Sequence, residues 1–365
     1  MQTWQWVIVG VFGILVLLAL SRGVDRTQPA TQGCTVMVRP GQSIQQTIDQ
    51  ASPGAVICLA EGSFPSEAEP DPYPPLLITK DLTLQGAGMA KTVITFGIDI
   101  RNMLETGEEP VFHVTLQNLS LQGALRISTH ARVTIRRVRL QLFARGTERK
   151  EPYLAYGGIS AGGHVHLKLE AVQVLTGIRG DPGLAFGGEE LEIRDSLFFG
   201  NEEAGIMISS SKDRAVNVKI RDSLILGNRR TGISLDASWG GHVELIGVGI
   251  IGNGTDPQCT RTDLFGDIQR FCNGISIVAE PSWRGPVGGM EIILRDLTIV
   301  GNADWGLAAE LEQCGYVEDR FTNGRVVFEG TNVIEGNNKL GIHTAQGNPG
   351  KHPFTNLPPG NVCLP

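Results

Sequence analysis

The chain has 365 residues, of which 41% are apolar and 19% charged, and its formal net charge is −7. This apolar content excludes a globally disordered chain, and 31 basic against 38 acidic residues leave no positive excess for binding nucleic acid. Glycine is enriched, at 47 residues or about 13% against a usual value near 7%, but without the three-residue period of collagen.

The N-terminal end is an apolar run followed by a polar stretch. Residues 6–20 are almost continuously apolar, and the run has 17 residues when it is counted from Trp4, which is short for a membrane-spanning helix but within the tolerated range. We interpret residues 1–22 as a signal peptide or as an uncleaved membrane anchor, and the sequence leaves both alternatives open. Residues 23–33 then form a polar tether, and residues 34–365 form one extracytoplasmic domain that is secreted, periplasmic or anchored at the cell surface.

Six cysteines agree with export, because an even number of cysteines in an exported chain indicates disulfides. Six cysteines allow fifteen sets of pairs. No Cys-x-x-Cys pair or Cys/His cluster has the spacing of a zinc site, so we predict no metal centre. Proximity along the chain favours the pairs Cys34–Cys58, Cys259–Cys272 and Cys314–Cys363.

A short helix is predicted near the start of the domain. Ser43 and Gln46 have the spacing of a capping box, and Ile44, Ile48 and Ala51 lie on one face of the helix that follows. We expect this helix to cover the open end of the β-structure that comes after it, where strand edges would otherwise be unpaired.

An internal repeat occupies much of the remaining chain. The segment LEIRDSLFFGN at residues 191–201 is followed by VKIRDSLILGN at 218–228, with related segments at 243–253, 292–302 and 326–337. Each unit alternates apolar and polar residues between turns, as half-buried strands do. The first repeated asparagines are 27 and then 25 residues apart, which suits one coil of a β-helix and not a propeller blade of about 40 residues.

The polar residues that recur in these units have a structural interpretation. At a turn, asparagine can adopt a left-handed conformation and form a hydrogen-bonded ladder from one unit to the next. The recurring aspartates are interpreted as turn residues in the same way. The residues concerned are Asn201, Asn228, Asn253, Asn302 and Asn337, together with Asp195, Asp222 and Asp296.

The entry segment at residues 43–64, the segment at 82–95 and the later repeats resemble the pectin-lyase-like superfamily of right-handed parallel β-helices. The resemblance covers roughly residues 36–345. It implies an all-β fold, namely a single-stranded right-handed parallel β-helix with a short N-terminal capping helix. Because the superfamily includes lyases, hydrolases, esterases, epimerases, tailspikes and adhesins, the resemblance implies no single activity. The signature motifs of polygalacturonases and pectin esterases are absent from the chain.

Stacking of the units predicts a candidate site. Corresponding positions of neighbouring coils lie about 4.8 Å apart, so acids that follow the Gly-initiated segments should form a column. Tryptophans beside carboxylates suit a sugar-binding face. A pair of such carboxylates can also act as acid and base, or hold calcium, in a polysaccharide-cleaving enzyme. The acids are Asp236, Glu280 and Glu310, and the tryptophans are Trp239 and Trp283.

His164 and His166 lie on one strand face, as metal ligands must. No acid or cysteine stands beside them in the sequence to complete a site, so we expect no metal there.

Three functions follow as hypotheses. The favoured one is an exported or tethered module that binds an envelope or extracellular polysaccharide without a cofactor. The alternative is a polysaccharide lyase or glycoside hydrolase with non-standard catalytic residues, with calcium only if it is a lyase. The third is a structural surface protein. Polysaccharide is the expected partner, with the membrane as a further one if the N-terminal segment is uncleaved, and nucleic acid is excluded.

Overall fold

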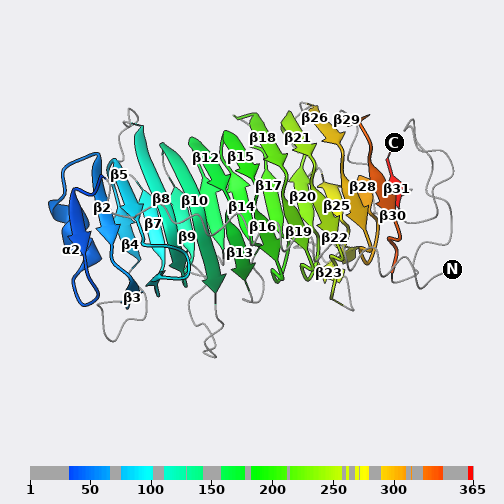
Figure 1. The fold of residues 1–365 in the computed structure, drawn as a ribbon. Helices are drawn as coiled ribbons and strands as arrows, with labels where there is room; N and C mark the ends of the chain where they lie inside the picture. Colours follow the sequence, from blue (N-terminus) through cyan, green and yellow to red (C-terminus); the bar gives the residue numbers. More distant parts are fainter. Residues whose placement is uncertain are drawn as a thin grey trace.

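The computed structural model describes residues 33–65, 75–101, 111–128, 130–142, 158–176, 182–211, 214–256, 260–262, 268–270, 272–278, 289–309, 314, 324–339 and 361–364. The predicted N-terminal signal or anchor, residues 1–22, lies outside these residues. The described part confirms the parallel β-helix. Its coils stack along one axis into an elongated molecule, with α2 at one end and β30 and β31 at the other (Figure 1).

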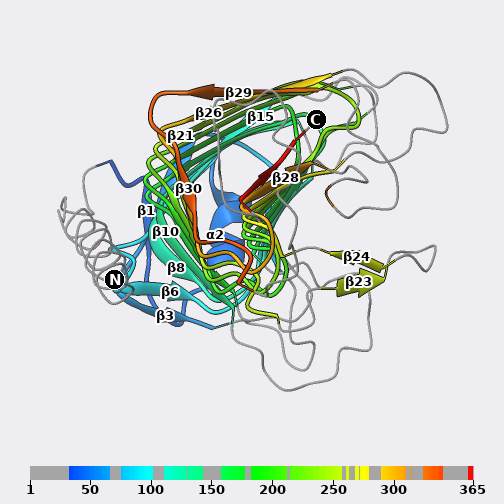
Figure 2. The same ribbon diagram turned by 90° about the vertical axis from the view of Figure 1, so that its right-hand side faces the viewer.

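A regular coil contributes three strands, and each strand pairs in parallel with its counterpart in the next coil. In the described residues, the first and second strands of the coils form a 19-stranded sheet, and the third strands form a 10-stranded sheet. Figure 2 shows the three resulting faces. Viewed from the C-terminal end, each coil runs counterclockwise while the chain advances towards the viewer, so the β-helix is right-handed (Figure 2).

Each strand of the β-helix has one of three positions in its coil. The first strands are β2 (Ala55–Leu59), β5 (Leu82–Gln85), β8 (Phe112–Leu121), β10 (Ala131–Leu142), β12 (Val165–Glu170), β15 (Glu190–Arg194), β18 (Val216–Arg221), β21 (Gly241–Ile246), β26 (Met290–Arg295) and β29 (Arg325–Glu329). The second strands are β3 (Gly62–Phe64), β6 (Thr92–Ile94), the later halves of β8 and β10, β13 (Gln173–Thr176), β16 (Leu197–Phe199), β19 (Leu224–Leu226), β22 (Gly249–Ile251), β27 (Thr298–Val300) and β30 (Val333–Glu335).

The third strands are β4 (Leu76–Ile78), β7 (Ile98–Arg101), β9 (Leu125–Ser128), β11 (Ile159–Gly162), β14 (Leu184–Gly187), β17 (Ile206–Ser209), β20 (Ile233–Asp236), β25 (Ile275–Val278), β28 (Leu307–Ala309) and β31 (Val362–Cys363). The remaining elements are β1 (Val36–Val38), which pairs with β2, the helix α2 (Ile44–Gln50), and an antiparallel pair, β23 (Thr260–Thr262) and β24 (Ile268–Arg270).

The core follows the strand alternation that the sequence predicts. Leu191 and Ile193 of β15, Phe198 of β16, and Ile206 and Ile208 of β17 point inward and are at most 1% exposed. Equivalent residues of the other coils join them in one continuous apolar cluster. Since each strand residue pairs in register with its counterpart in the next coil, the interior is a stack of matching apolar layers.

The asparagine ladder is present and buried. The Oδ1 atom of Asn228 accepts hydrogen bonds from the backbone N–H and Nδ2 of Asn201, at 3.0 and 2.6 Å, and the pattern repeats at each later step. Asn361 extends the ladder beyond the sequence prediction. The backbone prediction was wrong for these asparagines, because the preceding glycines, such as Gly200, take the positive φ. The aspartates of the other turn, Asp195 among them, do adopt left-handed conformations.

The glycine that precedes most of the third strands is explained by close packing between coils. A Cβ atom on Gly232 would lie 2.6 Å from the carbonyl oxygen of Gly274 and 2.7 Å from Cγ2 of Ile250. A side chain therefore does not fit between the coils at this position, which explains why Gly-Ile recurs in the sequence.

The predicted capping helix is confirmed as α2. The Ser43 hydroxyl accepts a hydrogen bond from the backbone N–H of Gln46 at 3.0 Å, and Ile44 and Ile48 are each 1% exposed. Figure 2 shows α2 behind the centre of the coil outline, so the helix closes the N-terminal end of the core.

The disulfides agree with the predicted pairing where the structure describes them. Cys34 pairs with Cys58, and Cys314 pairs with Cys363. Cys272 is also disulfide-bonded, whereas its predicted partner, Cys259, lies outside the described residues. Disulfides of this kind indicate an oxidising, extracytoplasmic environment. Among the described residues, no helix has the length and apolar character needed to cross a membrane.

Candidate functional site

The residues predicted from the sequence are only partly described. Asp236 ends β20, where its Oδ1 accepts hydrogen bonds from the backbone N–H and the hydroxyl of Ser238. Trp239 follows in the turn before β21, is half-buried, and donates its backbone N–H to the Ser210 hydroxyl at 3.0 Å. Strand pairing places Val278 opposite Asp236. Glu280, Glu310 and Trp283 lie outside the described residues, so the acidic column stays a prediction.

The outward side of the first strands carries rows of charged residues that cross from coil to coil. One row contains Lys168, Glu192, Lys219 and Glu244 on β12, β15, β18 and β21. The Lys168 ammonium lies 3.1 Å from Glu192, and that of Lys219 lies 2.9 Å from Glu244. Because the signs alternate along the sheet, neighbouring coils attract one another at the surface instead of repelling.

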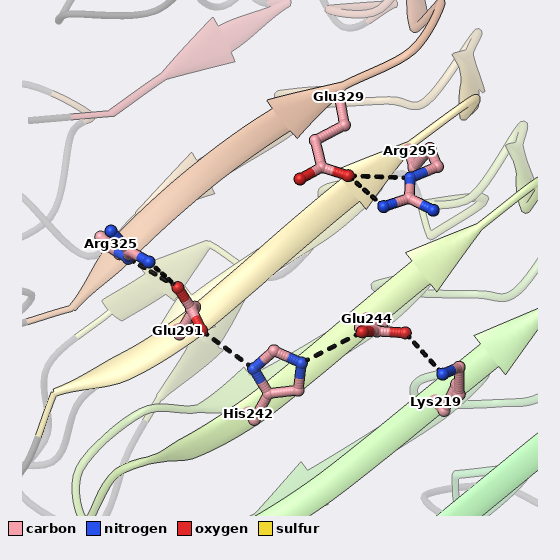
Figure 3. Close-up of polar contacts among 7 residues, drawn as sticks. All are labelled: Lys219, His242, Glu244, Glu291, Arg295, Arg325 and Glu329. Carbon is pink, nitrogen blue, oxygen red and sulfur yellow. Dashed lines mark hydrogen bonds and ion pairs between the residues drawn. The ribbon is translucent and has the colours of Figure 1, made fainter.

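His242 is at the centre of a longer polar chain on the same face (Figure 3). Its Nδ1 lies 3.1 Å from Oε2 of Glu291 and its Nε2 lies 3.3 Å from Oε1 of Glu244. Arg325 contacts Glu291 from β29, with its Nε at 2.7 Å from Oε1, and Lys219 contacts Glu244 from β18. Both nitrogens of the ring can donate to these carboxylates only when the imidazole is protonated.

A shallow groove opens on this face beside His242. Its volume is about 280 Å³, and side chains from three successive first strands line it. Asn217 is exposed, and its side chain has no hydrogen-bond partner among the described residues, so its amide is available to a ligand. We call this feature the first-strand groove. Its lining residues are Glu190, Leu191, Glu192, Asn217, Val218, Lys219, His242 and Glu244.

The surrounding cations keep the carboxylates of this face ionised. The hydrogen bond from Lys219 holds the pKa of Glu244 below its ordinary value, with His242 acting in the same direction and burial opposing. A hydrogen bond from Arg325 does the same for the pKa of Glu291, again with His242 contributing. At neutral pH these groups therefore act as fixed anionic acceptors, and the cations beside them hold them in place.

A second cluster of histidines lies three coils towards the N-terminus, at β12. His166 places Nε2 at 3.3 Å from Glu189 and Nδ1 at 2.8 Å from Glu190, while His164 contacts Glu189 through Nδ1. The expectation that no acid joins these histidines was therefore wrong, because the next coil supplies two. The ring of His130 lies edge-on to that of His164, with centroids 4.1 Å apart. Over the described residues, no three such side chains have an arrangement that holds a metal ion.

The first-strand groove is not among the sites predicted from the sequence. Its polar residues alternate with core residues, so each one alone resembles an ordinary solvated strand position. The signal was present in the repeat: Glu192, Lys219 and Glu244 are all the second residue of their units, and aligning the units on their asparagines places them in one row. These residues form a charged surface only because strand pairing aligns them across neighbouring coils.

Comparisons with known proteins concern the fold. No protein-family model and no curated protein sequence matches the chain. Among solved structures, the A-module of mannuronan C-5 epimerase AlgE4 from Azotobacter vinelandii is similar at 17% identity and a TM-score of 0.49, over 82% of this chain and 89% of that one. The AlgE6 A-module of the same organism gives 16% and 0.38, over 80% and 91%. ORF18 of Geobacillus virus E2 gives 12% and 0.38, over 82% and 62%. None of these similarities is high enough to transfer an activity to this chain.

Proposed function

We propose that this protein is an exported or membrane-tethered β-helix that binds an envelope or extracellular polysaccharide in the first-strand groove. The observation that carries the proposal is the groove itself, an open site lined by carboxylate, amide, ammonium and imidazole groups from three successive coils. Such groups donate to and accept from sugar hydroxyls. A polymer lying across the strands would meet a new set of these groups about every 4.8 Å. The motifs shared with pectin-lyase-like β-helices support placing the chain in that superfamily.

The charges of the groove favour a neutral, hydroxyl-rich polysaccharide. Glu190, Glu192 and Glu244 line it against a single lysine, Lys219, and His242. A polyanionic chain would face three carboxylates there and would need a bridging cation such as calcium to bind well. Trp239 lies in the turn before β21, the strand that carries His242, and is a candidate for an aromatic contact with a sugar ring, with Trp283 as a second candidate.

Binding should be tested with the full chain against a panel of neutral and acidic polysaccharides, with and without calcium. We expect Asn217→Ala to weaken binding at least several-fold, because its amide is exposed in the groove and has no partner to lose. The matched control is Thr115→Ala on β8, which lies on the same face outside the groove. Equal binding by the two variants would refute the groove as the site.

An enzyme acting on the same polysaccharide is the second candidate, because an imidazole held between two carboxylates has the geometry of a proton-transfer group. New reducing ends would identify a hydrolase, and new unsaturated uronate absorbance would identify a lyase. The acids predicted from the sequence, Asp236, Glu280 and Glu310, would then be tested beside His242. Glu280→Gln should abolish turnover and keep binding if that assignment holds. Binding without products supports the binding module. If the protein shows neither binding nor products, a structural surface role is favoured.

A further inference from the structure

The outward side of the second strands is apolar, in contrast to the charged first strands. On each of these strands the middle residue, such as Ile225 or Ile250, points into the core and is not exposed. Six consecutive strands, β13, β16, β19, β22, β27 and β30, offer twelve outward positions beside these core residues, and eight are apolar. We call these eight residues the second-strand face: Leu175, Leu197, Phe199, Leu224, Leu226, Ile251, Val300 and Val333.

This face is accessible to a partner. Phe199 is 47% exposed and Val333 is 40% exposed, while most of the others are half-buried by their neighbours in the adjacent coils. From the strand spacing and the distance between residues on one side of a strand, the face covers roughly 300–400 Å². An apolar surface of that size is comparable to the largest patch on a typical monomeric domain, and such patches are often functional.

The side chains of the face indicate which class of partner fits it: a sugar chain, a lipid surface or another protein. Phe199 is its single aromatic residue, so it lacks the row of rings on which a sugar chain stacks. It has none of the Lys, Arg, Trp or Tyr side chains that meet lipid head groups. Seven of its eight side chains are aliphatic and all come from one parallel sheet, and the surface that complements such an array is another sheet face of the same kind.

We propose that the second-strand face is the interface of a two-fold symmetric dimer of this chain. A two-fold axis brings the same apolar patch of two copies together, so one flat face is enough. The apolar centre covers about half of the roughly 800 Å² per partner that a stable interface buries. The flanking turns supply the rest as a polar rim, with exposed Asp195 and Asp222 on one side and the Glu202–Arg229 pair on the other.

The test is the oligomeric state of the purified full chain, measured by light scattering after size-exclusion chromatography. Leu226 lies on the third of the six strands, so a two-fold axis through the middle of the face places it near the partner's Leu226. We expect a dimer for the unmodified chain and monomers for Leu226→Lys and Leu226→Glu separately. An equal mixture of the two variants should recover the dimer, because lysine then meets glutamate across the axis.

The matched control is Val111→Lys, an exposed valine before β8 and outside the face. The control and the test variants all keep the N-terminal apolar segment, so a difference in oligomeric state between them is due to the second-strand face and not to that segment. Val333→Lys repeats the test at an exposed position where a lysine does not disturb the core. A monomeric unmodified chain, or a dimer that survives both Leu226→Lys and Val333→Lys, would overturn the proposal.

Discussion

The side chain of Asn228 links its own coil to the coils before and after it. Its Oδ1 accepts hydrogen bonds from the backbone N–H and the side chain of Asn201, and its Nδ2 donates one to Asn253 at 2.8 Å. Asn228 is completely buried. Asn228→Ala would leave two donors of Asn201 without partners away from water, at a cost of about 1–3 kcal/mol each. We expect the urea midpoint to fall clearly. Asn217→Ala, which removes an exposed amide, should leave it unchanged, and equal midpoints for the two variants would contradict the role of the ladder.

Gly232 should be intolerant of any side chain. A methyl group there would press against the backbone carbonyl of Gly274, which cannot rotate away. We expect Gly232→Ala to destabilise the protein by about 1–3 kcal/mol, as overpacking of a core does. Gly162→Ala is the control, because a Cβ on Gly162 would meet no atom within 4 Å. Thermal midpoints of the two variants, measured side by side, decide the question.

Acid should weaken the ion pairs of Glu244 and Glu291 on the outward side of the first strands. The pKa values of Glu244 and Glu291 are depressed in the folded protein below the ordinary value of 4.5. Their stabilising contribution is therefore complete above about pH 4.5 and is lost as the pH falls through the depressed values. We expect the thermal midpoint to drop on acidification below that range. The drop should be smaller in Glu244→Gln, and an identical acid profile for this variant would remove the carboxylate from the explanation.

The Cys34–Cys58 disulfide fastens β1 to the first full coil, beside the capping helix. It joins residues 24 apart in sequence, and cross-links of this length stabilise a fold by about 3 kcal/mol. The double variant Cys34→Ser, Cys58→Ser should have a lower thermal midpoint. Mild proteolysis should then cut first at the N-terminal coils, whereas a uniform pattern of cleavage would show that the bond does not act locally.

The sequence was sufficient for the fold because the same constraint recurs in every coil. The repeated asparagine, the glycine four residues later and the alternating apolar residues are each required by a contact with the next coil. Asn201 makes such a contact through a hydrogen bond, and Gly232 makes one through close backbone packing. The capping helix was equally readable, since the contact between Ser43 and Gln46 is local in sequence.

The candidate site was less predictable because it depends on register. Between Asn253 and Asn302 the spacing grows to 49 residues, and the sequence does not say which residues of that longer coil are aligned with the coil before it. The structure places Val278, and not Glu280, opposite Asp236. The chain from His242 to Glu291 crosses the same long coil, so the two residues meet although 49 positions separate them.

The ladder also makes the length of the molecule adjustable. Each buried asparagine presents the same acceptor to the coil before it and the same donors to the coil after it, so all layers have interchangeable junctions. A duplicated copy of residues 229–253 would match its neighbours on both sides and add one layer of about 4.8 Å. Growth of this kind lengthens the three strand faces in whole steps and leaves both ends of the protein unchanged.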